Sequence, residues 1–425
     1  MKEMYTWNPY SDQPDISIPK KRRFWRHCKR LGSYVSLASA NLLKAVPVLS
    51  LYRKYWNSLY KNPCSIGDPF AVSVSPLEKK NSEIIELLKE TGVSRTLVRV
   101  HSWDKERLST CDTLCHLLKR EGLDLSIALL QERKDVLNPV RWQEFVDHVF
   151  SRFKVYSSFF EIGHAWNRAK WGLWDYKEYL KLSRHALFLA RKHGVRLVGP
   201  AVIDFEFHLY PPVLKEIPFD VVSSLLYVDR VGAPENKQSG WDTSRKLALL
   251  RAVVDGSLRN TPPLWITEVN WPLKGTGKYS PVSGEPNVTE EEQASYLVRY
   301  YVLCLASGFV DRIYWWQLIA PGYGLIDSRD KPWRRRPSFY AFKNMVAHLE
   351  GARFIEKLSH SRIQIFLFRK KQDHFAIVWA KERVPWEQSA ISMEVNKVIN
   401  RDGKKISFKK NELCIDGNPC YVFFK

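Results

Sequence analysis

Eight short apolar segments, separated by segments of helix length, constrain the fold of this 425-residue chain more than any other feature. Strands that alternate with helices form parallel sheets, and eight such units in about 250 residues are typical of a closed barrel. We therefore predict an α/β fold, a (β/α)8 TIM barrel. The segments begin at residues 71 (AVSVS), 96 (TLVRV), 124 (DLSIALL), 158 (SFFEIG), 196 (RLVGPAV), 220 (DVVSSLLY), 263 (PLWITEVNW) and 312 (RIYWWQL).

The segments between these strands have the apolar periodicity of amphipathic helices. The clearest begin at residues 81 (NSEIIELLKETG), 140 (VRWQEFVDHVFSRF), 176 (YKEYLKLSRHALFLARKHG) and 290 (EEEQASYLVRYYVLCLASG). The last follows Thr289, a plausible cap, with Glu292 three residues later. No glycine-rich phosphate loop follows the first strand, which counts against a dinucleotide-binding fold.

The pattern divides the chain into three parts: a basic N-terminal extension at 1–67, the barrel at 68–350 and a C-terminal domain at 351–425. The last part has no helical pattern; its segments alternate apolar and polar residues around turn signals at Asp402-Gly403 and Asp416-Gly417. We expect a small β-sandwich-like domain there.

The N-terminal extension carries +9 of the net charge of +21, which suggests an anionic partner. Residues 31–52 (LGSYVSLASANLLKAVPVLSLY) have basic flanks and are moderately apolar, as in an interfacial helix on an anionic membrane. A leader that packs against the barrel is the alternative, and a transmembrane helix is a weaker one. Because no recognition helix or RNA-binding motif appears, we expect no nucleic-acid partner.

The seven cysteines are odd in number and lack the spacing of metal ligands. This favours free thiols in a reducing compartment. We expect no metal and no cofactor, and a cytoplasmic protein held peripherally at the inner face of the membrane.

Three polar residues come at or near the ends of predicted strands, where the active sites of such barrels lie. Glu268 is in the seventh strand, between Trp265 and Trp271; Arg99 is in the second and Tyr227 in the sixth. An Arg and a Tyr that converge on one carboxylate keep it ionised and oriented, as a nucleophile requires. Each residue taken alone has a structural explanation, such as a salt bridge or barrel packing.

The segments PLWITEVNWP, RIYWWQLIAPGYGLID and RRRPSFYAFKNM resemble the seventh strand, eighth strand and closing helix of clan A retaining glycoside hydrolases, near the xylosidase and iduronidase family. The tail resembles their small β domain. The resemblance covers about residues 68–425 and implies a double-displacement mechanism on a carbohydrate. It implies Glu268 as nucleophile and a sugar platform at Trp315 or Trp316. We expect the following substrate-binding residues: Arg99, Trp103, Asn167, Tyr227, Trp271, Trp315 and Trp316.

One essential position departs from the pattern of this family. The fourth strand should end in Asn-Glu, where Glu is the general acid and base, but here the sequence is His164-Ala165. Ala165 cannot transfer a proton, a contribution of about 10² to 10⁴ in rate. His164 is the first candidate substitute and our second expected catalytic residue. Glu206 and His208 are others, whereas Glu161 is expected to be buried in the barrel.

Three functions remain open. The first is an active retaining enzyme on a poly- or oligosaccharide, either a hydrolase with a substitute acid or a transglycosylase in surface polysaccharide metabolism that uses an activated donor. The second is an inactive glycan-binding protein. The third, a nucleic-acid binder, is disfavoured because Glu268, Arg99 and Tyr227 are all present. The ligand could be acidic or lipid-linked.

Overall fold

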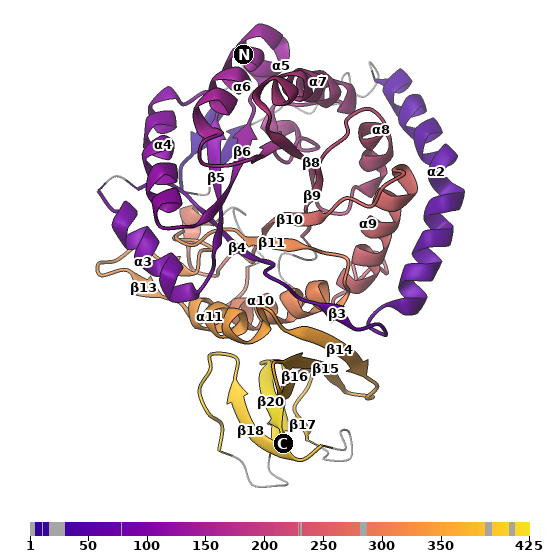
Figure 1. Ribbon diagram of the computed structural model, residues 1–425, viewed down its shortest axis with the longest axis vertical. Helices are drawn as coiled ribbons and strands as arrows, with labels where there is room; N and C mark the ends of the chain where they lie inside the picture. The colour runs from indigo at the N-terminus through magenta and orange to yellow at the C-terminus, as the bar shows by residue number, and fades with distance from the viewer. Residues whose placement is uncertain are drawn as a thin grey trace.

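The computed structural model describes residues 5–10, 12–16, 30–77, 79–227, 229, 232–280, 287–386, 393–407 and 413–425. Its centre is a closed barrel of eight parallel strands, surrounded by helices (Figure 1). The predicted (β/α)8 fold is confirmed, and each strand falls on a predicted segment. The strands are β4 (Phe70–Val74), β5 (Arg95–His101), β6 (Asp124–Leu130), β7 (Phe159–Ile162), β8 (Arg196–Ile203), β9 (Val221–Leu225), β10 (Leu264–Val269) and β11 (Arg312–Trp315).

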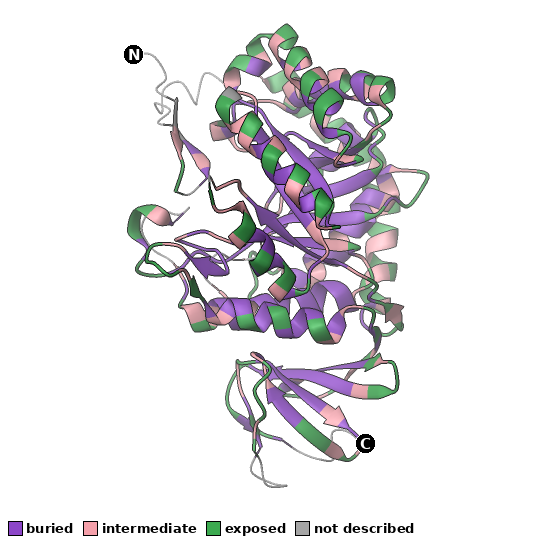
Figure 2. Cartoon of the chain, turned by 60° about the vertical axis from the view of Figure 1, so that its left-hand side comes forward, coloured by how far each residue is buried: buried purple, intermediate pink, exposed green. Residues whose placement is uncertain are grey.

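The helices between the strands pack apolar faces on the barrel and leave polar faces to solvent (Figure 2). At the start of α10, the Glu292 N–H donates a hydrogen bond to the Thr289 hydroxyl, and the Thr289 N–H donates one to the Glu292 carboxylate. These two bonds form the predicted cap. The helices are α3 (Asn81–Thr91), α4 (Lys105–Arg120), α5 (Arg133–Leu137), α6 (Pro139–Phe153), α7 (Tyr176–His193), α8 (Tyr210–Leu214), α9 (Thr243–Ser257), α10 (Glu290–Ala306) and α11 (Pro337–Leu349).

The C-terminal residues form antiparallel sheets below the barrel (Figure 1). The larger sheet has six strands in the order β18-β20-β16-β15-β14-β3, and the smaller pairs β17 (Val384–Pro385) with β19 (Cys414–Ile415). The strands of the larger sheet are β3 (Cys64–Ser65), β14 (Arg353–Leu358), β15 (Ile363–Lys370), β16 (Asp373–Ala380), β18 (Val395–Asn400) and β20 (Cys420–Phe424). The strand β3 comes from the N-terminal side of the barrel, so this sheet joins two distant parts of the chain.

The N-terminal residues contact the barrel at two further places. The strands β1 (Tyr5–Asn8) and β2 (Gln13–Ile16) form an antiparallel hairpin. The helix α2 (Leu31–Ser58) runs along the outside of the barrel beside α8 and α9 (Figure 1). Among the described residues, α2 alone has the length and apolar composition of a helix that could cross a membrane.

Candidate active site

Three predicted site residues meet at the carboxyl ends of the barrel strands. Arg99 comes from β5, Glu268 from β10, and Tyr227 follows β9 by two residues. One carboxylate oxygen of Glu268, Oε2, accepts a hydrogen bond from Arg99 Nη2, and the other, Oε1, accepts one from the Tyr227 hydroxyl at 2.6 Å. Closure of the barrel brings these strand ends together at one face, although the residues are far apart in the sequence.

The environment of Glu268 keeps its carboxylate ionised. Burial raises the pKa of Glu268, but the charge of Arg99, the contact with His164 and the hydrogen bond from Tyr227 outweigh burial and lower this pKa to about 2. Only 7% of the residue is exposed. The result is a desolvated, oriented anion at neutral pH, the form that a carboxylate nucleophile needs.

His164 also lies in this cluster, at the end of the fourth barrel strand. Its Nε2 is 3.0 Å from Arg99 Nη2 and 3.3 Å from Glu268 Oε2. Its backbone N–H donates to Gln131 Oε1 at 2.9 Å, which fixes the loop. Burial, followed by the charge of Arg99, lowers the pKa of His164 to about 4. The imidazole is therefore neutral at physiological pH and carries no spare proton for a general acid.

The two residues that flank His164 have left-handed backbone conformations. Gly163 has φ of 75°, and a Cβ there would lie 2.7 Å from Cε2 of Tyr179, so the turn at the end of β7 requires glycine. Ala165 has φ of 42° and is fully buried in an apolar cluster inside the barrel. The Ala165 side chain is not among the groups that line the cavity at Glu268.

The cavity at Glu268 has a volume of about 260 Å³ and contains a second carboxylate, Asp12. Asp12 follows the turn of the N-terminal hairpin and is 6% exposed. Its Oδ2 is 3.2 Å from Arg99 Nη1 and accepts a hydrogen bond from Gln317 Nε2 at 3.4 Å. One guanidinium group thus lies between the carboxylates of Asp12 and Glu268.

The hairpin is held over the cavity by aromatic and polar contacts. The ring of Trp7 lies 4.7 Å from that of His101 and 5.1 Å from that of Trp103, and the Lys170 ammonium donates to the Gln13 amide oxygen. Four residues that were not predicted also line the cavity: Asp12, Gln13, Lys170 and Trp171. No local signal indicates Asp12, which lies 87 residues before Arg99 in the chain.

The predicted aromatic positions need correction. Trp316 lines the cavity, and the Arg99 guanidinium stacks on its ring at 3.2 Å. Trp315 and Trp271, by contrast, are 0% and 1% exposed and stack on each other at 6.3 Å in the core, so neither is a sugar platform. Trp103 packs on His101 and Trp7 and is not among the described residues that line the cavity.

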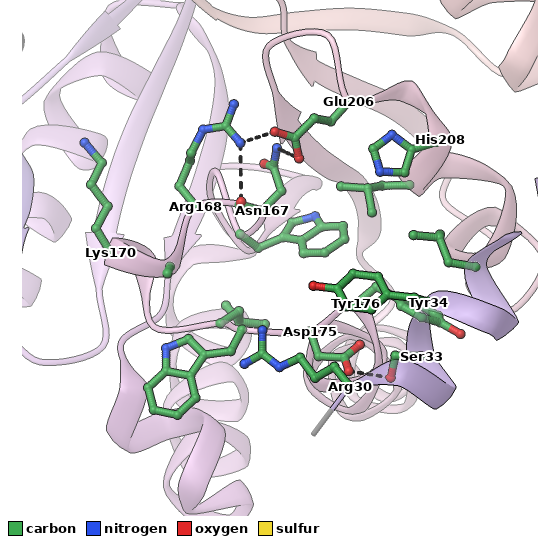
Figure 3. Close-up of a pocket in the computed structure, with 16 residues that line it drawn as sticks. Arg30, Ser33, Tyr34, Asn167, Arg168, Lys170, Asp175, Tyr176, Glu206 and His208 are labelled. Carbon is green, nitrogen blue, oxygen red and sulfur yellow. Dashed lines mark hydrogen bonds and ion pairs between the residues drawn. The ribbon is translucent and has the colours of Figure 1, made fainter. Parts of the chain in front are cut away.

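Asn167 faces a neighbouring pocket of about 640 Å³ (Figure 3). Its Nδ2 donates to Glu206 Oε2 at 2.9 Å and to a backbone carbonyl, and Asn167 does not line the Glu268 cavity. Glu206 and His208 line the same pocket and not the cavity. Glu161 is buried in the barrel, as expected, and burial raises its pKa to about 7.

Comparison with solved structures finds the same barrel fold in glycoside hydrolases. A family 39 glycoside hydrolase from the gut symbiont Bacteroides cellulosilyticus WH2 is 14% identical, with a TM-score of 0.66 over 84% of this chain and 81% of that chain. The GH51 arabinofuranosidase from Xanthomonas axonopodis pv. citri is 10% identical, with a TM-score of 0.55 over 86% of this chain and 98% of that chain. At these identities the likeness shows the fold alone. No protein-family model and no curated protein matches the sequence.

Proposed function

We propose that this protein is a retaining carbohydrate-active enzyme in which Glu268 attacks the anomeric carbon of a sugar. The observation that supports this role is the buried carboxylate of Glu268, paired with Arg99 and Tyr227 and held at a pKa of about 2. A structural ion pair needs only the contact with Arg99. A nucleophile needs a free approach as well, and Glu268 has one through the cavity.

The same cluster restricts the leaving group of the substrate. Ala165 has no proton to give, and the imidazole of His164 is neutral because its pKa is about 4. A general acid is worth about 10² to 10⁴ in rate when the leaving group is a poor one. We therefore infer a donor whose leaving group departs as a stable anion, such as a sugar bound to phosphate.

Asp12 supplies the group that the second half-reaction needs. In the first step a Glu268 oxygen forms a bond to the anomeric carbon as the bond to the leaving group breaks, and that group departs with the electron pair. In the second step Asp12 accepts the proton of water or of a sugar hydroxyl as its oxygen displaces Glu268. Asp12 lines the same cavity as Glu268, and its Oδ2 is held 3.2 Å from Arg99 Nη1.

The nucleophile is tested with a panel of 2-deoxy-2-fluoro glycosyl donors that carry acidic leaving groups. The fluorine slows the second step, so the glycosyl-enzyme accumulates, and mass analysis should find the sugar on the peptide that contains Glu268. The control is Glu268→Gln, which removes the nucleophile but keeps the side-chain volume. A sugar on another peptide, or equal labelling of the control, would contradict the assignment.

Asp12 is tested by Asp12→Asn with a donor that the wild-type protein turns over. We expect release of the leaving group in the first turnover to be unchanged and steady-state turnover to fall by about 10² to 10³. Added azide should restore turnover and yield a glycosyl azide, because azide attacks without loss of a proton. Turnover that is unchanged or faster in Asp12→Asn would show that Asp12 is no base.

A glycan-binding protein without turnover is the second candidate, and Ala165 favours it. A binding protein has no need of an acid, and the same cavity can hold a sugar. Glycan binding by both the wild-type protein and Glu268→Gln, with no labelled peptide from any donor, would support this alternative.

A further inference from the structure

Exposed apolar side chains are concentrated on one helix of this protein. Of the 14 large apolar side chains that are exposed among the described residues, eight belong to α2. Their exposed fractions reach 77% at Leu42, 78% at Leu43 and 79% at Val46. We call the outer face of α2 the stripe formed by Leu31, Val35, Leu42, Leu43, Val46 and Leu49.

The opposite face of α2 packs on the barrel. Asn41 Nδ2 donates to the His208 carbonyl at 2.8 Å, and the Tyr55 hydroxyl donates to Asp255 at 2.6 Å. Val48 packs so closely on α9 that a Cβ at Gly256 would lie 2.8 Å from its Cγ2. Asn41 and Tyr55 thus point inward together with Val48, whereas a stripe of large apolar side chains points outward, unlike a helix at a water-exposed surface.

Charged residues are absent from the outer face of α2 but frequent in the sequence on either side of it. Lys44 is the one charged residue between positions 31 and 52, and its ammonium points inward to the carbonyl of Ser257 at 3.3 Å. Basic residues stand at both ends: residues 20–30 include seven Lys or Arg and no acid, and Arg53 and Lys54 are exposed near the C-terminal end. In the sequence, the uncharged apolar stripe is therefore flanked by basic residues on both sides.

We propose that the outer face of α2 docks the protein on an anionic lipid bilayer, with the helix axis parallel to the membrane plane. Apolar side chains then enter the boundary between headgroups and acyl chains, and the basic flanks meet anionic headgroups. The inward hydrogen bonds to the barrel favour a helix that lies on the bilayer over one that crosses it. The first turn of α2 also forms a wall of the pocket in Figure 3, which adjoins the Glu268 cavity at Arg168 and Lys170.

Vesicle flotation of the full chain tests this proposal. The double variant Leu42→Glu/Val46→Glu places two charges on the outer face, and both sites are exposed, so folding should be intact by circular dichroism and thermal melting. The matched control is Val140→Glu/Val155→Glu, at the ends of α6, on another side of the barrel (Figure 1). Val140 and Val155 are 59% and 64% exposed, and the control changes the net charge equally.

We expect the wild-type protein to float with vesicles of phosphatidylcholine and phosphatidylglycerol, and more weakly with phosphatidylcholine alone. The outer-face variant should lose at least about tenfold in partition coefficient, and the control less than about twofold. Equal flotation of the wild-type protein and the outer-face variant would overturn the proposal. The proposal would also be overturned if the wild-type protein is a dimer that does not float and the outer-face variant is a monomer. In that case a second copy of the chain would cover this face. Flotation does not depend on the proposed function, which is tested separately by sugar labelling at Glu268.

Discussion

Replacement of Arg99 by methionine tests the electrostatic core of the site. Arg99 is 3% exposed, and its guanidinium pairs with both Glu268 and Asp12. Methionine preserves much of the apolar stem but removes the charge, so two carboxylates lose their common partner. Removal of one partner from a buried ion pair costs about 3–5 kcal/mol. We expect a loss of this size in the free energy of unfolding at about pH 7.

The loss in the free energy of unfolding should depend on pH, and the direction of this dependence follows from the pKa of Glu268. This pKa is about 2 in the folded protein against a reference value of 4.5, and at about 1.4 kcal/mol per pH unit the interval is worth about 3 kcal/mol. Because the pKa is lowered on folding, the wild-type protein has this stability above pH 4.5 and loses it as pH falls toward 2. In Arg99→Met burial dominates and the folded pKa of Glu268 rises above 4.5, so the variant gains stability as pH falls toward 4.5, and the difference in unfolding free energy between variant and wild type should narrow from about pH 7 downward.

Urea unfolding followed by tryptophan fluorescence, at several values from about pH 7 to about pH 4, gives this gap directly. The control is Arg107→Met, because Arg107 lies 3.9 Å from Asp12 and its side chain is 22% exposed. This weaker pair should cost less than about 1 kcal/mol, with little pH dependence. A loss in Arg99→Met that is small, or equal at all pH values, would refute the ion pair between Arg99 and Glu268 as the source of the low pKa.

Three further substitutions test the barrel around the site. From about pH 4 to about pH 8, the free energy of unfolding of Glu161→Gln should rise by about 3 kcal/mol relative to that of the wild type. The reason is that folding raises the pKa of Glu161 from 4.5 to about 7, so the wild-type protein loses stability as pH rises through 7. A difference that is constant with pH in urea unfolding contradicts this. Ala165→Glu should lower the free energy of unfolding by more than about 2 kcal/mol and should not give hydrolysis of unactivated glycosides, because Ala165 is fully buried. Hydrolysis of such glycosides would show that the introduced carboxylate reaches the cavity. Gly163→Ala should cost at least about 1 kcal/mol, because its Cβ would lie 2.7 Å from Tyr179; an unchanged melting temperature would show that the loop adapts.

The barrel was predictable because its signals are local. Each strand is a short apolar run between helices with their own periodicity and caps, and closure of the barrel then directs the strand ends to one face. Arg99, Tyr227 and Glu268 could be named for that reason. The choice between Trp315 and Trp316 could not be made, since successive side chains of a strand point to opposite faces and the sequence does not say which face is inward.

Asp12 and α2 could not be placed from the sequence for a different reason. The position of the hairpin depends on contacts of Trp7 and Asp12 with residues about 90 positions away, and no periodic pattern encodes such contacts. For α2 the composition alone allowed packing on the barrel or contact with a membrane. The structure shows that one face packs on the barrel, which leaves the apolar outer face to be explained.

The charges at the cavity limit what the transferred sugar can be. The buried groups Glu268, Asp12 and Arg99 together carry a charge of −1, because one guanidinium serves two carboxylates. In the proposed mechanism, a net negative charge would stabilise the positive charge that develops on the sugar ring in the transition state, and it would disfavour a ring that itself carries a carboxylate. Lys170 and Arg168 line the side toward the larger pocket, where Arg168 pairs with Asp204 and Glu206. Under the proposed mechanism, the buried charges next to Glu268 therefore favour a neutral sugar ring over one that carries a carboxylate.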